Sequence, residues 1–264
     1  MSAEVVLLSV DARGVATITL NRPRVNNAYD GEMIRALHEH ALCCASDPAV
    51  RVVVLRGNGA HFQAGADLAW IGEIAARGEE ENRAVSRRTA TALSELDALA
   101  KPTVALVHGG CFGGGVGLIA CCDVVLASED ARFAISEVRW GLVPDIIVPQ
   151  LNAAIGRRQV RRFALSGERF DAHTAKAIGL VHEICPPGGL DAAAAPVIDA
   201  LLLSAPEAVA QTKAAVRAGG GVAPDDEDFE RLVRAHALKR RSREAAEGLA
   251  CFAEKRKPRW YPQR

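Results

Sequence analysis

Residues 103–117 read TVALVHGGCFGGGVG and include the most unusual segment of the chain, a cluster of glycines. Its first five residues are an apolar run that follows Lys101 and Pro102, which predicts a short buried strand. Glycines at 109, 110, 113, 114, 115 and 117 come next and lead into LIACC, which predicts a helix. The segment is therefore a glycine-rich connection from a buried strand to a helix.

Two explanations of these glycines remain open. Bare backbone lets a ligand approach closely, and the amides at a helix N-terminus favour negative charge. A tight connection packed against neighbouring backbone accounts for the same glycines without a ligand. A dinucleotide-binding fingerprint is disfavoured, because the glycines fit GxGxxG only loosely and no acidic residue follows at the expected offset.

On both sides of this stretch, strand and helix patterns alternate over about 185 residues, and the rest of the chain is helical, which predicts an α/β core with a helical appendage. We place the core at residues 1–200 and the C-terminal helical region at 201–264. The expected strands are 4–10, 15–20, 51–56, 103–107, 123–128, 133–135 and 180–184. The expected helices are 31–46 with Asp30 as N-cap, 80–99, 149–165 split near Gly156, 170–177, and 190–254 interrupted by Pro206 and by a turn at 219–224.

Composition limits the function. The 264 residues carry 32 basic and 32 acidic side chains and only 5% aromatic residues, which argues against nucleic-acid binding but leaves room for a compact anionic ligand. No uncharged apolar stretch of about 18 residues occurs, so we expect no membrane span. The seven cysteines show no CxxC spacing, so we expect neither a disulfide framework nor a metal site, and a cytoplasmic location.

The loop FQAGAD, residues 62–67, is a second candidate functional segment. Alanine and glycine leave the main chain bare, so that an amide such as that of Ala66 can face a cleft. The alternative is an ordinary surface turn, which is the favoured interpretation for the loop taken alone. His61 and His108 flank the two loops, and a lone histidine beside a loop is more often structural than catalytic.

The segment ISEVRWGLVPD, residues 135–145, is the third candidate. Glu137 lies among apolar residues, where the neutral carboxyl is favoured, as suits a general acid or base. The alternative is an ion pair with Arg139. Asp145 is either a second carboxylate or the N-cap of a following helix. Together, two loops of main-chain donors and one carboxylate would suit a thioester enolate.

In combination, the motifs of this sequence resemble the enoyl-CoA hydratase/isomerase (crotonase) superfamily. The motifs that carry the resemblance occur in the family's order: ITLNRP, AGAD, the GGG turn followed by ACCD, SEVRWGLVP, SGERFDAHTAKAIGLVHEI and EGLACFAEKRKPRW. The resemblance implies a crotonase-like spiral of ββα repeats with a C-terminal helical trimerisation region. It also implies an acyl-CoA thioester substrate, no separate cofactor because CoA is part of the substrate, and a homotrimer or dimer of trimers.

The resemblance also assigns roles to individual residues. Ala66 and Gly114 would donate the two amides of an oxyanion hole, and Glu137 matches one of two catalytic glutamates. Asp145 matches a catalytic aspartate of dienoyl-CoA isomerases.

CoA itself would be held by residues of two regions. Ala64 and Asp67 come from the AGAD loop. Phe252 and Lys255 come from the C-terminal region and would act across a subunit boundary. Part of the EKRKPR cluster would then meet the phosphates of CoA.

One departure from the family bears on the reaction. The second glutamate of straight-chain hydratases is Gly117 here. The segments ACCDVVLASEDARF, SEVRWGLVP and AIGLVHEI look most similar to hydratases of branched glutaconyl-CoA esters, and Gly117 would leave room for such a chain. We therefore expect a branched enoyl-CoA hydratase. The alternatives are an isomerase that uses a single glutamate and a non-catalytic acyl-CoA binding subunit.

Overall fold

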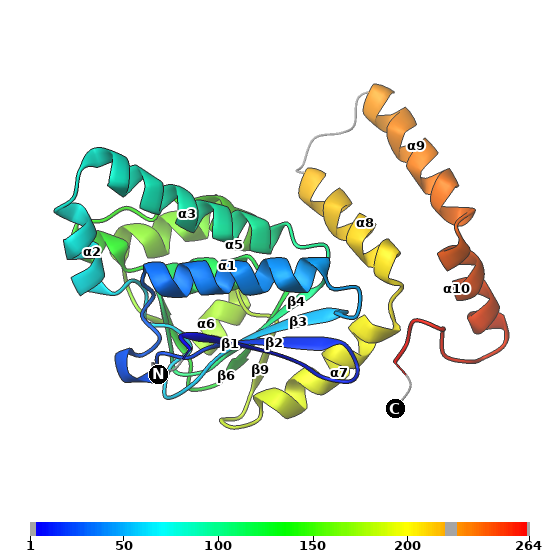
Figure 1. Ribbon diagram of the computed structural model, residues 1–264, viewed down its shortest axis with the longest axis horizontal. Helices are drawn as coiled ribbons and strands as arrows, with labels where there is room; N and C mark the ends of the chain where they lie inside the picture. Colours follow the sequence, from blue (N-terminus) through cyan, green and yellow to red (C-terminus); the bar gives the residue numbers. More distant parts are fainter. Residues whose placement is uncertain (1–3, 220–225, 263–264) are drawn as a thin grey trace.

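Two sheets of mostly parallel strands form the core of the computed structural model, which describes residues 4–219 and 226–262 (Figure 1). In spatial order, the larger sheet contains β1 (Val6–Val10), β2 (Val15–Leu20), β3 (Val52–Gly57), β4 (Thr103–Val107), β6 (Val124–Ser128) and β9 (Glu183–Cys185). Only the β1–β2 pair of this sheet is antiparallel. The smaller sheet contains β5 (Gly110–Phe112), β7 (Arg132–Ala134) and β8 (Phe170–Asp171).

Successive units of the chain give one strand to each sheet. The strand β4 in the larger sheet and β5 in the smaller sheet are followed by α4 (Gly114–Ala120). In the same way, β6 in the larger sheet and β7 in the smaller sheet are followed by α5 (Val148–Ser166). This is the spiral of ββα repeats that the resemblance implied, so the predicted α/β crotonase-like fold is confirmed.

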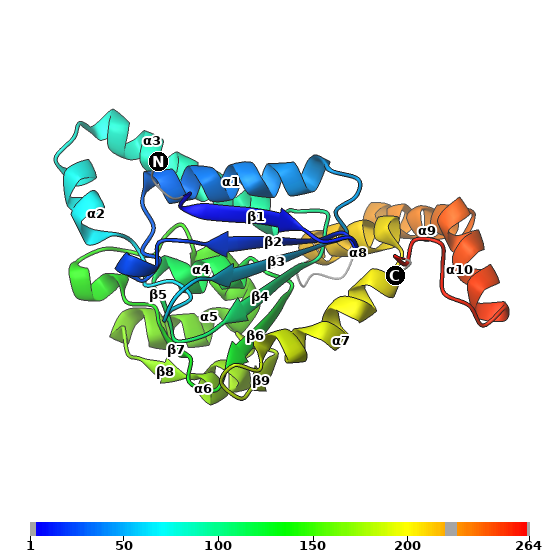
Figure 2. The same cartoon turned by 60° about the horizontal axis from the view of Figure 1, so that its bottom comes forward.

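Helices cover both faces of the larger sheet. The helices α1 (Gly31–Ser46) and α3 (Glu79–Asp97) lie side by side on one face, and α7 (Leu190–Leu203) lies on the other (Figures 1 and 2). In β3, Val53 and Leu55 join the core on the α1 side, whereas Val52 and Val54 join the core on the α7 side. Because both faces are covered, the central strands β3 and β4 consist mainly of valine, leucine and alanine.

The predicted helix boundaries are largely confirmed. The Asp30 side chain caps α1 by accepting a hydrogen bond from Met33 N at 2.9 Å. The break expected near Gly156 is present in α5, where that residue has a φ of 73°. The remaining helices of the core are α2 (Leu68–Ala75) and α6 (Ala172–Ala177), with short 3₁₀ turns at Pro23–Val25 and Glu137–Trp140.

Three segments differ from the prediction. The residues GCF at 110–112 form β5, although glycine is a poor strand former, because they pair with β7. The helix predicted at 170–177 begins only at Ala172, after the strand β8. The strand predicted at 180–184 begins at Glu183, because the Leu180 and Val181 amides bond to Ala175 O and close the end of α6.

The C-terminal helices extend away from the two sheets (Figures 1 and 2). They are α8 (Pro206–Ala218), α9 (Asp226–Arg240) and α10 (Arg243–Ala253). The chain then returns to the core, where Trp260 Nε1 donates to Leu203 O at 2.8 Å. The boundary placed between residues 200 and 201 lies inside α7, and all but the first residue of the turn predicted at 219–224 lies outside the described residues.

Among the described residues, no single helix is long and apolar enough to cross a bilayer. The helices α7 and α8 reach the necessary length and hydropathy only as a pair bent by 103°.

A fully buried asparagine positions the loop that leads into the AGAD segment. Asn27 is inaccessible to solvent and its Nδ2 donates to His61 O at 2.9 Å and Phe62 O at 3.1 Å. Its Oδ1 accepts from Arg22 N at 2.8 Å. Its φ of 56° lies in the left-handed region, which asparagine adopts more readily than other residues with a side chain. Asn27 therefore joins the end of β2 to the loop at 61–63.

We predict that Asn27→Ala lowers the free energy of unfolding by about 3 kcal/mol, because buried donors and acceptors lose their partners and alanine is strained at this φ. Urea denaturation measures the change. The control is Asn58→Ala, whose exposed side chain bonds only to Asn21, and which should cost less than about 0.5 kcal/mol. Equal losses in the two variants would contradict the role given to Asn27.

Candidate active site

A large, mainly apolar cavity gathers most of the predicted site residues. Its volume is 990 Å³. The predicted residues that line it are Ala64, Ala66, Asp67, Gly114 and Glu137. Three segments thus meet at one place: the strand-to-helix connection, the AGAD loop and the Glu137 segment. Their predicted residues lie up to 73 positions apart in the chain, from Ala64 to Glu137.

Backbone hydrogen bonds join the first two of these segments. Gln63 N donates to Gly110 O at 3.1 Å, and Phe112 N donates to Gln63 O at 2.9 Å. The backbones of the two loops lie close together at Gly65 and Gly113: a Cβ on Gly113 would lie 3.7 Å from Gly65 Cα. Gly65 and Gly113 have φ values of 91° and 52°, a conformation that favours glycine.

Each of these two glycines is followed by one of the predicted oxyanion donors. Neither the Ala66 N–H nor the Gly114 N–H has an acceptor among the described residues. Gly114 is the first residue of α4, and the first amides of a helix have no partner within it. Two free amides at one cavity wall can together hold a developing oxyanion.

Glu137 contributes a carboxylate to the same cavity from a 3₁₀ turn. Its Oε2 atom is buried and has no hydrogen-bond partner within the described part of the chain. Its Oε1 lies 3.2 Å from the position that a Cβ on Gly113 would take. Burial raises the pKa of the Glu137 carboxyl above its ordinary value, and nearby backbone amides of Ser136 and Glu137 lower it by a smaller amount.

The ion pair between Glu137 and Arg139 that the sequence left open is absent. Arg139 Nε instead donates to Gly167 O at 2.9 Å. The carboxylate is therefore available to a ligand, and a desolvated, unpaired carboxylate is suited to proton transfer.

Asp67 and Ala64 lie at the cavity wall with partners of their own. Asp67 caps α2 by accepting from Ala69 N at 3.1 Å, and its Oδ2 lies 3.3 Å from Arg22 Nη2. Ala64 N donates to Asn26 O at 3.0 Å.

The structure does not bring Asp145 into the cavity. Asp145 is exposed, whereas its neighbours Pro144 and Ile146 line the wall. The alternative role as a helix cap is wrong, because α5 begins after Ile147 and no side chain caps it.

Gly117 is buried and faces a filled space. A Cβ at this position would overlap Cγ2 of Ile147, whose side chain also lines the cavity. The expectation that Gly117 leaves extra room for the acyl chain is therefore wrong: Ile147 fills the space that a longer side chain at 117 would need.

Phe252 and Lys255 lie outside this cavity, on the C-terminal arm. By this name we mean the helices α8, α9 and α10 with the segment that follows them. Phe252 is 85% exposed, and Lys255 is exposed with a φ of 53°. Neither residue is among those that line the cavity within the same chain.

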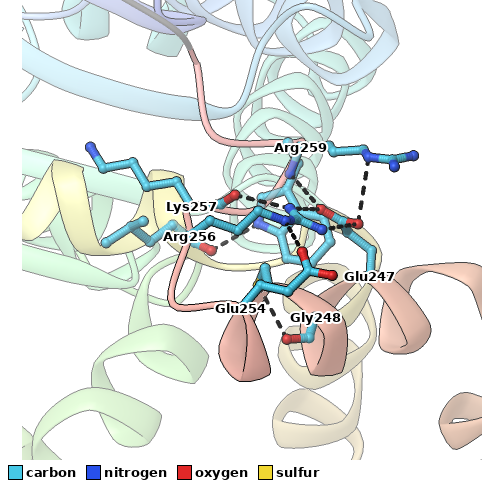
Figure 3. Close-up of polar contacts among 9 residues, drawn as sticks. Glu247, Gly248, Glu254, Arg256, Lys257 and Arg259 are labelled. Carbon is cyan, nitrogen blue, oxygen red and sulfur yellow. Dashed lines mark hydrogen bonds and ion pairs between the residues drawn. The ribbon is translucent and has the colours of Figure 1, made fainter.

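Part of the basic cluster beside them is already neutralised (Figure 3). Arg256 bonds to Glu247 through Nη1 at 2.7 Å and Nη2 at 3.0 Å, and also contacts Glu254. These bonds from Arg256 lower the pKa of Glu247 to about 2. Lys257 lies 3.8 Å from the centre of the Tyr261 ring. Arg256 is thus held by carboxylates of its own chain.

His61 and His108 have the structural roles that were favoured for them. His61 Nδ1 accepts from Gly110 N at 2.8 Å, and His108 Nε2 lies 2.9 Å from Gly59 O. The seven cysteines are free thiols, and among the described residues no three His, Cys, Asp or Glu side chains are placed to hold a metal ion.

Tyr29 and Ile147 are among the cavity residues that the sequence analysis did not single out. Tyr29 precedes the N-cap of α1, and Ile147 precedes α5. Neither stands in a motif, and only the three-dimensional structure places them beside Gly114 and Gly117.

The raised pKa of Glu137 predicts a pH-dependent effect of Glu137→Gln on stability. In the folded chain the ionised carboxylate is disfavoured by burial, so this cost is absent below the ordinary pKa of 4.5 and fully present above the raised pKa. Relative to the natural chain, the free energy of unfolding of Glu137→Gln should therefore rise as the pH increases from below 4.5 to above the raised pKa of Glu137. Urea denaturation at pH 4 and pH 8 measures it, and a pH-independent difference would contradict the prediction.

The Gly117–Ile147 contact predicts strong coupling between two substitutions. Gly117→Ala should lower the free energy of unfolding by about 1–3 kcal/mol, because the added methyl group overpacks a filled site. In the Ile147→Ala background the same substitution should cost much less. A double-mutant cycle measures the coupling, and additive effects would show that Ile147 does not fill the space.

Comparison with known proteins agrees with this geometry. The chain matches the family described as enoyl-CoA hydratase/isomerase over residues 11–263. It is 38% identical to an enoyl-CoA hydratase from Shewanella pealeana, whose crystal structure superposes with a TM-score of 0.92 and covers 97% of this chain and 96% of that one.

Two curated relatives extend the comparison. The mevalonyl-coenzyme A hydratase of Aspergillus fumigatus is 32% identical over 262 residues, which cover 98% of this chain and 95% of that protein. The carnitinyl-CoA dehydratase of Salmonella typhi is 34% identical over 253 residues, covering 93% and 94%. The chain therefore belongs to the enoyl-CoA hydratase/isomerase family and is an enzyme of that family with its crotonase fold.

Proposed function

We propose that this protein adds water to a branched, glutaconyl-type 2-enoyl-CoA. One observation carries the proposal: the buried Glu137 Oε2 has no partner among the described residues, and it lies in the cavity that also holds the free amides of Ala66 and Gly114. The cavity thus offers a base, an acid after that base has taken a proton, and two donors for an oxyanion.

The proposed reaction contains two proton transfers, and Glu137 makes both of them. The Ala66 and Gly114 amides hold the thioester oxygen. Glu137 removes a proton from water as the water oxygen bonds to C3, and the electron pair of the double bond moves into the thioester enolate. The protonated Glu137 then returns a proton to C2, which restores the carboxylate. One carboxylate serves both steps.

Support for a branched, carboxylated acyl chain comes from the cavity. It measures 990 Å³, with largely apolar walls. Arg169 also lines it and forms no ion pair within the described residues; its guanidinium carbon lies 5.2 Å from the centre of the Phe112 ring. A free guanidinium at an apolar cavity suits a second carboxylate on the substrate.

The assembly belongs to the same proposal. The C-terminal arm exposes the apolar side chains of Val216, Leu238, Leu249 and Phe252. We propose that these helices assemble the chain into a trimer or a dimer of trimers. Phe252 and Lys255 would then contact CoA bound in the cavity of a neighbouring subunit.

A second candidate function is double-bond isomerisation. It is favoured by Gly117 and Ile147, which leave no second glutamate at the position used by straight-chain hydratases. An isomerase needs one carboxylate that removes a proton from the alpha carbon (C2) of the acyl chain and returns it to the gamma carbon (C4). Glu137 alone is sufficient for this chemistry.

A substrate panel in ¹⁸O-labelled water tests the proposal. The enzyme should convert a branched glutaconyl-CoA to a product that carries one added water with the label, detected by mass spectrometry. Glu137→Gln should lower kcat by at least about 100-fold, because the base and acid are one group, while the acyl-CoA remains bound. Isomerisation of a 3-enoyl-CoA without any gain in mass would instead support the second candidate.

Two variants serve as controls for this assay. Glu39→Gln makes the same chemical change at an exposed position on α1 and should leave the rates unchanged. Arg169→Gln should raise KM for the carboxylated ester but not for an uncharged enoyl-CoA. If Arg169→Gln affects both esters equally, the assignment of a carboxylated substrate fails, and if Glu137→Gln remains fully active, the hydratase assignment fails.

A further inference from the structure

Tyr29 occupies a place between the two loops that carry the free amides. Its backbone belongs to the first loop, because Tyr29 N donates to Gly65 O at 2.9 Å and its carbonyl accepts from Asp67 N at 2.8 Å. These bonds place Tyr29 directly opposite Ala66 in a parallel bridge. Tyr29 has no part in the proposed proton transfers, and the family resemblance assigns it no role.

The side chain of Tyr29 reaches the second loop. Its ring lines the cavity, and its hydroxyl oxygen lies 3.2 Å from the position that a Cβ on Gly114 would take. A side chain on residue 114 would therefore collide with the ring, and glycine at that position lets the phenol lie against the start of α4. Tyr29 is thus adjacent to both candidate oxyanion donors, to Ala66 through its backbone and to Gly114 through its side chain.

The ring is held in place while the hydroxyl remains free. Trp70, from α2, packs edge-on against the Tyr29 ring with centroids 6.2 Å apart and planes at 68°. The Tyr29 hydroxyl forms no hydrogen bond with residues 4–219 and 226–262. A phenol that is fixed by packing and faces a cavity without a partner is prepared to bond to a ligand.

We propose that the Tyr29 hydroxyl is a third donor to the thioester oxygen, alongside the Ala66 and Gly114 amides. The bond strengthens as the carbonyl oxygen gains negative charge in the enolate, so Tyr29 acts on the transition state more than on substrate binding. The hydroxyl keeps its own proton throughout, and no covalent bond to Tyr29 forms. This inference rests on the proposed function only in that a thioester must bind in the cavity.

The protonation state of Tyr29 is consistent with a donor. Burial, with a smaller contribution from the negative charge of Glu137, raises the pKa of Tyr29 to about 12. The phenol is therefore neutral at physiological pH and donates a hydrogen bond rather than acting as a base. The nearby Glu137 carboxylate remains free for proton transfer.

Tyr29→Phe removes only the hydroxyl and keeps the ring that packs against Gly114 and Trp70. Two reactions are measured for this variant: hydration of the enoyl-CoA, and exchange of the C2 protons of a saturated acyl-CoA in deuterated water. The exchange needs Glu137 and a stabilised enolate but no attacking water. We expect both rates to fall by about 100-fold with little change in KM, the usual effect of losing one oxyanion donor.

Tyr261→Phe is the matched control, since Tyr261 is the other tyrosine of the chain and lies outside the cavity. Thermal unfolding of all three proteins shows whether Tyr29→Phe has kept its fold. Rates within about twofold of the natural chain, or a loss of hydration with unchanged exchange, would overturn the proposal, because an oxyanion donor must affect both reactions. If the natural chain exchanges C2 protons but never hydrates, the hydratase proposal fails while the role of Tyr29 can still be measured.

Discussion

The backbone of Gln63 is hydrogen-bonded to both ends of the strand Gly110–Phe112, and the cavity depends on this junction. It holds together two loops that lie almost fifty residues apart in the chain. The Gln63 side chain, only 3% exposed, also accepts from Gly65 N at 3.1 Å. These bonds use the amides at 65 and 112, and Gly113 N donates to Ala134 O. The Ala66 and Gly114 amides remain without an acceptor among the described residues, and both residues line the cavity.

Much of the fold and three segments of the site could be predicted from the sequence. Alternating strand and helix patterns, the cap at Asp30 and the break at Gly156 are local signals, which act within a few residues. The glycine-rich connection and the isolated Glu137 were also visible, because glycine repeats and a carboxylate among apolar residues are unusual compositions.

The features that could not be predicted depend on contacts between distant residues. The strand Gly110–Phe112 exists because of its partner β7, against the weak strand preference of glycine. Whether Glu137 pairs with Arg139 was open until the Ser166–Gly167 turn was seen to bind the arginine. The packing of Tyr29 against Gly114 brings together residues 85 positions apart. The periodicity of apolar residues reflects local structure only, so it cannot predict contacts between residues that are distant in the chain.

The contact between Gly117 and Ile147 also constrains how this chain can evolve. A carboxylate at position 117 first needs a smaller residue at 147, since any Cβ at 117 overlaps the isoleucine. The two positions are therefore coupled: a side chain at 117 costs less once residue 147 is smaller, and a smaller residue at 147 leaves space that a side chain at 117 can fill. A single-glutamate enzyme of this shape is therefore separated from one with a second glutamate at 117 by at least two coupled substitutions rather than by one.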